Sequence, residues 1–178
     1  MRLIVFKRPV YLTFAPPEAL NYSGLMLATL RYARPTEFVA VPRVYEKFKE
    51  MIELRMRDSN AFVSTIYEWA KSKGYGNTIA QLQNDPSPFG YNFAKVMVLR
   101  KIKEELGLDR IEYSYFGAAP MNSEVKKFFM SLGMPLINTY GLSETSGGAT
   151  YMEPPFFTFD KIGRPIPGTE IKIFNPDE

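Results

Sequence analysis

The stretch IEYSYFGAAPMNSEVKKFFMSLGMPLINTYGLSET, Ile111 to Thr145, decides the fold. Residues 111–116 alternate in the manner of a β-strand, and residues 134–140 return to strand composition. Between them, residues 122–133 open with an N-cap residue, carry one apolar face and end in glycine, which is typical of a helix. The stretch therefore predicts a strand–helix–strand unit.

Strands that alternate with helices usually lie parallel in one sheet, and their carboxyl ends open at a shared edge where ligands bind. The turn Gly117–Pro120 follows the first of these two strands, and the loop Tyr140–Thr145 follows the second. If the strands are neighbours, their axes lie about 5 Å apart. Both loops can then hold opposite sides of one flat molecule.

The rest of the chain extends the α/β pattern. Residues 9–14 and 36–41 are predicted as short strands, with a helix at residues 23–31 between them. Further helices are predicted after Pro42, up to a stop at Gly74, and from about residue 93 to Gly107. The apolar faces predicted to be buried are Val44–Phe48–Met51, Phe62–Ile66–Trp69 and Val96–Leu99–Ile102–Leu106.

Two segments interrupt the helices and strands or follow them. Residues 74–92 combine Gly, Pro, Asn and Asp in turn-forming pairs, which predicts an ordered surface loop. Residues 170–174 alternate cleanly and are predicted to begin a separate sheet. No internal repeat or low-complexity tract is evident.

Composition limits the chemistry. The 178 residues are 46% hydrophobic and 23% charged, as expected of one globular domain or part of a larger one. Cysteine and histidine are both absent, which excludes disulfides, thiol nucleophiles and imidazole bases. No apolar run approaches the roughly 20 residues that span a bilayer. The 22 basic and 19 acidic residues are spread along the chain, so nucleic-acid binding is not expected.

The first loop and Tyr140 suit a purine. Gly117, Ala118 and Ala119 have little or no side chain, so a planar ring can approach their backbone and bond to its N–H and C=O groups. Tyr140 offers a π face on the other side, and stacking of a base on an aromatic ring contributes about 1–3 kcal/mol. Alternatively, Tyr140 is an ordinary buried aromatic residue.

The second loop suits phosphate and a metal ion. Ser143 and Thr145 carry hydroxyls, and successive N–H groups around Gly141 can form a concavity for phosphate oxygens. Glu144 is the only carboxylate in this loop, which is sufficient for Mg²⁺ that also binds substrate phosphates and water. Alternatively, Ser143 or Thr145 simply caps a following turn.

These motifs support a family resemblance. The segments YFGAAPMNSEVKKFF and NTYGLSETSGG resemble the adenine and phosphate motifs of the adenylate-forming superfamily. The segments LATLRYARPTEFVAVPRVYEKFKEMI, VLRKIKEELGLDRIEY and IGRPIPGTEIKIFNPDE are most similar to long-chain acyl-CoA synthetases of the bubblegum type. The resemblance extends from about Ala19 to Glu178.

The resemblance implies a fold and a reaction. Residues 1–160 would form an incomplete AMP-binding α/β subdomain, with a mostly parallel sheet flanked by helices. Residues 161–178 would begin a β-barrel subdomain. The reaction would join a fatty acid to ATP with loss of pyrophosphate, and coenzyme A would then displace AMP. Mg²⁺ would assist the first step.

The resemblance also implies roles for individual residues. Ala118, Ala119 and Pro120 would line the adenine, Tyr140 would stack on it, Ser143 would meet the α-phosphate and Glu144 would hold Mg²⁺. Residues 38–44 would lie near the acyl tunnel, and Gly147 and Gly148 near the substrate carboxylate.

Several parts of the family pattern have no counterpart in this sequence: a phosphate loop, the ribose-binding aspartate, a hinge and a domain with a catalytic lysine. The chain is therefore predicted to be a central fragment, inactive alone. Its full-length parent would be cytoplasmic, with peripheral association at the endoplasmic reticulum membrane. Two alternatives stay open: activation of another carboxylic acid, and a nucleotide- or acyl-binding module or regulatory relic without catalysis.

Overall fold

The computed structural model describes residues 11–20, 23–152 and 161–174. Its strands form one five-stranded sheet in the order β1-β2-β3-β4-β5. They are β1 (Glu37–Ala40), β2 (Tyr113–Phe116), β3 (Leu136–Leu142), β4 (Gly147–Tyr151) and β5 (Arg164–Pro165). The helices are η1 (Pro17–Leu20), α1 (Ser23–Ala33), α2 (Pro42–Arg57), α3 (Ala61–Gln83), α4 (Tyr91–Ala94), η2 (Lys95–Leu99), α5 (Arg100–Leu106), α6 (Ser123–Ser131) and η3 (Ser143–Thr145).

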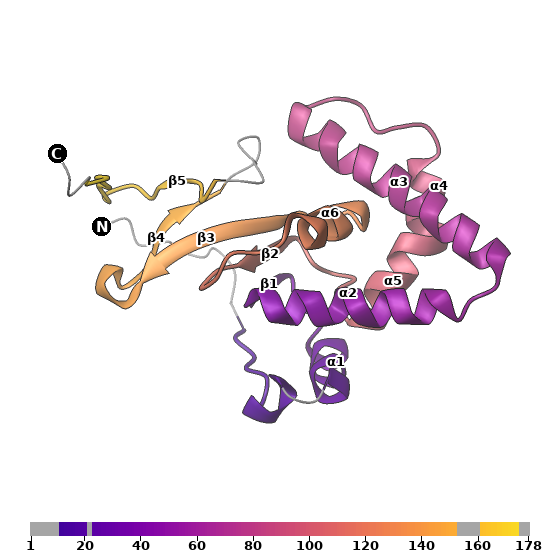
Figure 1. Cartoon of the computed structure of the whole chain (residues 1–178), viewed down its shortest axis with the longest axis horizontal. Helices are drawn as coiled ribbons and strands as arrows, with labels where there is room; N and C mark the ends of the chain where they lie inside the picture. The colour runs from indigo at the N-terminus through magenta and orange to yellow at the C-terminus, as the bar shows by residue number, and fades with distance from the viewer. Residues whose placement is uncertain (1–10, 21–22, 153–160, 175–178) are drawn as a thin grey trace.

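The first three strands are parallel and confirm the predicted α/β fold. Tyr115 of β2 lies opposite Val39 of β1 and Ile137 of β3, so β2 is the central strand of this parallel part. Helices α2 to α5 connect β1 to β2, and α6 connects β2 to β3. Strands β4 and β5 continue the sheet in antiparallel fashion (Figure 1). The β3–β4 hairpin thus reaches away from the helical end of the molecule.

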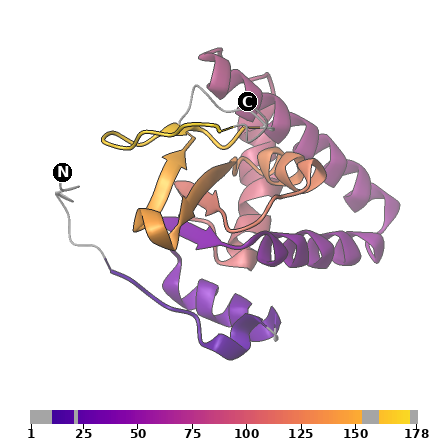
Figure 2. The ribbon, with the colours of Figure 1, turned by 60° about the vertical axis from the view of Figure 1, so that its left-hand side comes forward.

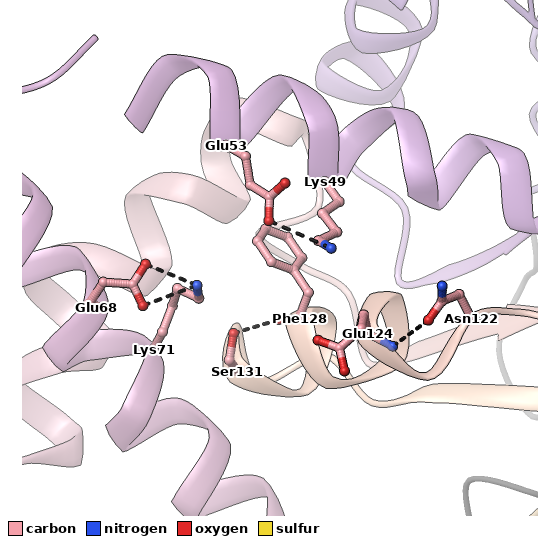
Figure 3. A network of polar contacts seen from close by, with 8 residues as sticks. All are labelled: Lys49, Glu53, Glu68, Lys71, Asn122, Glu124, Phe128 and Ser131. Carbon is pink, nitrogen blue, oxygen red and sulfur yellow. Dashed lines mark hydrogen bonds and ion pairs between the residues drawn. The ribbon is translucent and has the colours of Figure 1, made fainter. Parts of the chain in front are cut away.

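Local sequence signals begin the main helices. Pro42 occupies the start of α2, where its missing N–H is not needed. Asn60 caps α3 by accepting a hydrogen bond from the Val63 N–H at 2.9 Å. Asn122 caps α6 in the same way, accepting from the Glu124 N–H at 2.8 Å (Figure 3). The Asn122 cap fixes where α6 starts after the Gly117–Pro120 turn.

The core lies between α2, α6 and one face of the sheet. Tyr45 of α2 and Phe129 of α6 are both fully buried, and their rings meet edge to face at 5.2 Å. Tyr45 also donates a hydrogen bond of 2.9 Å to the Tyr115 carbonyl. Phe116 at the end of β2 is 1% exposed. Burial of an apolar side chain of this size contributes about 1.5–3 kcal/mol, so Phe116 anchors the end of β2 to the core.

Helix α6 also packs against α3, and this contact corrects the predicted helix stop. Gly74 lies in the middle of α3, where a Cβ would stand 2.0 Å from the Ser131 carbonyl oxygen. Thr78, one turn later, donates a hydrogen bond of 2.8 Å to the Met130 carbonyl. Gly74 therefore permits a close helix contact rather than ending the helix. The predicted surface loop at residues 74–92 is therefore wrong for residues 74–83, which continue α3, and confirmed for residues 84–90, which connect α3 to α4.

The predicted buried face of α3 is also wrong. Phe62 is 74% exposed and Trp69 is 37% exposed, although Trp69 meets the ring of Phe93 edge to face. Contact with α6 through Gly74 turns a different face inward, formed by Tyr67, Ala70, Gly74, Asn77, Thr78 and Ala80. Lys71, beside this face, lies 5.5 Å from the ring centroid of Phe128 and pairs with Glu68 (Figure 3).

The other predicted helical faces are largely confirmed. Val44 and Phe48 of α2 are buried, with Ile52 rather than Met51 completing the face. Leu99 and Leu106 are buried as well, whereas Val96 is 61% exposed. A π-helical turn over η2 shifts the register there, which explains why Val96 leaves the face.

Two predicted strands do not form. Residues 11–14 form no strand, and residues 9–10 lie outside the described residues. Residues 170–174 also form no strand, so the predicted β-barrel subdomain and the boundary at residue 160 stay predictions. In the part of the chain that the structure describes, no helix is long and apolar enough to cross a membrane.

Candidate functional site

The ends of β2 and β3 are adjacent, as the sequence predicts. Phe116 pairs with Asn138, and the contact continues to the next residues, because a Cβ on Gly117 would stand 2.7 Å from the Thr139 carbonyl oxygen. The Gly117–Pro120 turn and the segment that begins at Tyr140 therefore leave the sheet side by side. Only glycine fits at position 117 at this separation.

The turn after β2 presents its backbone to solvent. Ala118, Ala119 and Pro120 are exposed, and Gly117 is half-buried. Ala118 has φ +67°, a left-handed conformation that few alanines adopt. Among the described residues, none bonds to the N–H groups of Ala118 or Ala119. That these groups bind a purine stays a prediction.

The segment after β3 differs from the predicted loop. Strand β3 continues through Tyr140 and Gly141 to Leu142, and η3 then turns the chain into the antiparallel strand β4. A Cβ on Gly141 would stand 1.8 Å from the Gly147 carbonyl oxygen, so glycine permits the close approach of β4. The loop predicted at Tyr140–Thr145 is thus the last part of β3 and the tip of a β-hairpin (Figure 2).

Tyr140 lies where a ligand can reach it. It is 41% exposed, which contradicts the alternative of an ordinary buried aromatic residue. It pairs with Thr150 across the hairpin, and a bulge separates it from Gly141. Thr139, the residue before Tyr140, lies against Gly117 at the start of the turn. The structure therefore brings the backbone of the turn and the aromatic ring to one edge of the sheet.

The hydroxyl of Thr145 holds the hairpin tip. It accepts a hydrogen bond of 2.9 Å from the Leu142 N–H and lies 2.7 Å from the Gly147 carbonyl oxygen. This agrees with the capping alternative for Thr145 and leaves its hydroxyl little capacity for phosphate. The structure gives no further support to a role of Thr145 in cofactor binding, and that role stays a prediction.

Ser143 and Glu144 remain accessible at the same tip. Both are exposed, and neither side chain bonds to another described residue. A single accessible carboxylate fits Mg²⁺ that is also held by nucleotide phosphates, because such an ion takes only one or two protein carboxylates. The described residues contain no group of three acidic or other metal-binding side chains, so they offer no all-protein cage. Gly147 and Gly148 lie on the adjoining strand and are exposed.

Two residues near the turn were not singled out from the sequence. The Thr139 hydroxyl donates a hydrogen bond of 3.1 Å to the Phe116 carbonyl and so links the two strand ends. Lys126 of α6 is only 8% exposed, and its Nζ lies 5.4 Å from the centroid of the Phe116 ring. Thr139 directly precedes Tyr140, which is a signal that the sequence offered. Nothing in the sequence around Lys126 indicates that its side chain is buried.

Comparison with known proteins identifies the class. Residues 8–178 match the family of AMP-binding enzymes. The chain belongs to this family. No solved structure matches it.

The similar proteins are bubblegum-type ligases, as the motifs imply. The chain is 38% identical to the long-chain-fatty-acid–CoA ligase ACSBG2 of Xenopus laevis over 92% of its own length and 22% of that protein. It is 35% identical to the long-chain-fatty-acid–CoA ligase ACSBG1 of Bos taurus over 92% of its length and 22% of that protein. ACSBG2 of Homo sapiens is 32% identical over 93% of the chain and 25% of that protein. The chain thus spans about a fifth to a quarter of these relatives.

Proposed function

We propose that this chain forms the nucleotide- and magnesium-binding part of a long-chain fatty-acid:CoA ligase. The observation that carries the proposal is the contact of Gly117 with Thr139, which joins the exposed turn to the strand that carries Tyr140. The purine of ATP would lie between the backbone at Ala118 and Ala119 and the ring of Tyr140. Pro120 would border the purine, and the backbone at Gly141 would lie near the phosphates.

The hairpin tip would act on the phosphates. Ser143 would donate a hydrogen bond to the α-phosphate, and Glu144 would hold Mg²⁺. When bound, Mg²⁺ would supply positive charge near the phosphoryl oxygens, where negative charge develops in the reaction of the fatty-acid carboxylate with ATP. A donor positioned before the reaction adds to this stabilisation without reorganisation. Exposure of both side chains supports these roles.

The acyl group would approach from the neighbouring strand. Ala40 at the end of β1 lies opposite Phe116, so residues 38–44 reach the same sheet edge as the turn. The names of the relatives specify long-chain fatty acids as their substrates. Gly147 and Gly148, which lack side chains, would leave room for the substrate carboxylate. A series of acids of different chain length, tested in a protein of the relatives' length, distinguishes this substrate from shorter or aromatic acids.

The complete reaction would need more than the residues of this chain. The chain spans 22% and 25% of two of its relatives, and the family resemblance places a phosphate loop and a lysine-bearing domain outside the motifs found here. We therefore propose that the chain alone binds ATP but does not exchange pyrophosphate into it or form acyl-CoA. A cytoplasmic parent enzyme with peripheral association at the endoplasmic reticulum membrane stays a prediction.

Calorimetric titration with ATP, with and without Mg²⁺, tests the proposal. We expect Mg²⁺ to tighten ATP binding to the wild-type chain, and Glu144→Gln to abolish this increase while sparing metal-free binding. Glu124→Gln is the matched control, since Glu124 pairs with Lys127 on α6. Failure of the wild-type chain to bind ATP, or an unchanged Mg²⁺ effect in Glu144→Gln, would refute the proposal. Robust pyrophosphate exchange by the chain alone would refute its predicted incompleteness.

A further inference from the structure

We propose that Thr139 is a positioning residue for purine recognition, a role that rests on the proposed nucleotide site. Its hydroxyl would set the orientation of the turn after β2 and so decide which purine the turn accepts. Thr139 itself need not touch the purine.

A side-chain hydrogen bond joins the ends of β2 and β3. The Thr139 hydroxyl donates to the Phe116 carbonyl at 3.1 Å. That carbonyl belongs to the peptide between Phe116 and Gly117. Because a peptide is planar, fixing its carbonyl also fixes the direction of the Gly117 N–H. The side chain of Phe116 is buried, so this peptide has a fixed base.

Gly117 also packs closely against Thr139. A Cβ on Gly117 would stand 2.9 Å from the Thr139 Oγ1 as well as 2.7 Å from its carbonyl oxygen. The turn therefore lies against the threonine side chain itself. Ala118 follows in the left-handed conformation, which persists only where neighbouring contacts impose it. The hydroxyl bond is one such contact.

The two ends of the turn are held by different contacts. Met121 is 6% exposed and Asn122 caps α6, so both anchor the far end of the turn to the helix. Within the described residues, the N–H groups of Ala118 and Ala119 have no hydrogen-bond partner. The Thr139 hydroxyl is thus the side-chain contact that fixes the near end. Its loss would free the backbone groups that would recognise the edge of the purine.

The matched variants are Thr139→Val, which removes the hydroxyl at constant shape, and Thr139→Ser, which retains it. ATP and GTP affinities would be measured by calorimetry, and backbone order parameters of Gly117 to Ala119 by NMR relaxation. We expect Thr139→Val to reduce the ATP-over-GTP preference by about two- to tenfold, the worth of one hydrogen bond. The order parameters of the turn should fall below the rigid value of about 0.85. Thr139→Ser should retain the wild-type nucleotide preference and the wild-type order parameters.

A purely structural role would lower the melting temperature of Thr139→Val without changing nucleotide preference or turn order, and that result would overturn the inference. So would equal losses in Thr139→Val and Thr139→Ser. If the wild-type chain binds no nucleotide, the proposed function fails. The order parameters of the ligand-free variants then decide the inference: a lower value in Thr139→Val alone supports the positioning role, and equal values overturn it.

Discussion

Gly141 lies directly against Gly147 across the β3–β4 hairpin, so closely that a Cβ on Gly141 would stand 1.8 Å from the Gly147 carbonyl oxygen. This contact sets the separation of the two strands just after Tyr140. The tip that carries Ser143 and Glu144 is therefore held by a backbone approach that only glycine permits.

Substitution of Gly141 by alanine should distort the hairpin, because the new Cβ meets backbone rather than a movable side chain. We expect Gly141→Ala to lower stability by about 1–3 kcal/mol, as overpacking generally does, and to weaken ATP binding. Gly148→Ala is the control, since its Cβ would meet nothing within 4 Å and should change stability by less than about 0.5 kcal/mol. Urea unfolding of both variants measures the difference; equal effects would contradict the account of the hairpin.

Gly74 should be equally intolerant for a different reason. Gly74→Ala places a Cβ 2.0 Å from the Ser131 carbonyl and forces α3 away from α6. We expect a loss of about 1–3 kcal/mol, despite the better helix propensity of alanine. Gly24→Ala in α1 has open space around its Cβ and should be neutral or stabilising. Thermal unfolding distinguishes them, and a stabilised Gly74→Ala would show that the helices do not pack so closely.

Two buried tyrosines should respond oppositely to loss of their hydroxyls. Tyr45 donates its hydroxyl to the Tyr115 carbonyl, so Tyr45→Phe should cost about 1 kcal/mol. The hydroxyl of Tyr67 is buried without a hydrogen-bond partner among the described residues, so Tyr67→Phe should be neutral or stabilising. Chemical unfolding measures both values. A larger loss for Tyr67→Phe than for Tyr45→Phe would contradict this arrangement.

The same tyrosines predict sensitivity to alkali. Burial raises the pKa of Tyr45 and of Tyr67 above the ordinary value of 10.0, and the charges of Glu68 and Glu53 raise that of Tyr67 further. The folded state therefore holds these protons more tightly than the unfolded chain. Their contribution to stability is complete below pH 10 and is lost as the pH rises toward the folded-state pKa.

We therefore expect cooperative unfolding above pH 10, with the last phenolate absorbance appearing together with the loss of helical circular dichroism. If all 11 tyrosines ionised near pH 10 while the helical signal persisted, the predicted burial would be wrong.

The strand–helix–strand unit and its shared edge could be predicted from sequence because they depend on local patterns. Within residues 111–140, the alternation of the strands and the cap and terminal glycine of the helix are all local signals. Because a helix joins the two strands, the strands are expected to be parallel neighbours. The face of α3 could not be predicted in this way. Phe62 and Trp69 repeat at helical spacing, yet the contact of Gly74 with α6 decides which face turns inward.

The site was predicted in part for the same reason. The small residues at 117–119 and the ring of Tyr140 lie where the strand order places them. The hairpin after Tyr140 was missed because its turn consists of SETS between strands rich in glycine, without a common two-residue turn signal. Its formation depends on long-range pairing of Gly141 with β4, which no local window reveals.

The central claim is that the turn after β2 and the ring of Tyr140 hold one purine, and NMR titration with ATP and Mg²⁺ tests it most directly. Amide signals of Gly117 to Ala119 and ring signals of Tyr140 should shift with one shared dissociation constant. Tyr140→Ala should weaken that constant by about 5- to 150-fold, equivalent to 1–3 kcal/mol of stacking, whereas Tyr140→Phe should preserve it. Shifts confined to one of the two segments, or equal affinity in Tyr140→Ala, would contradict the claim.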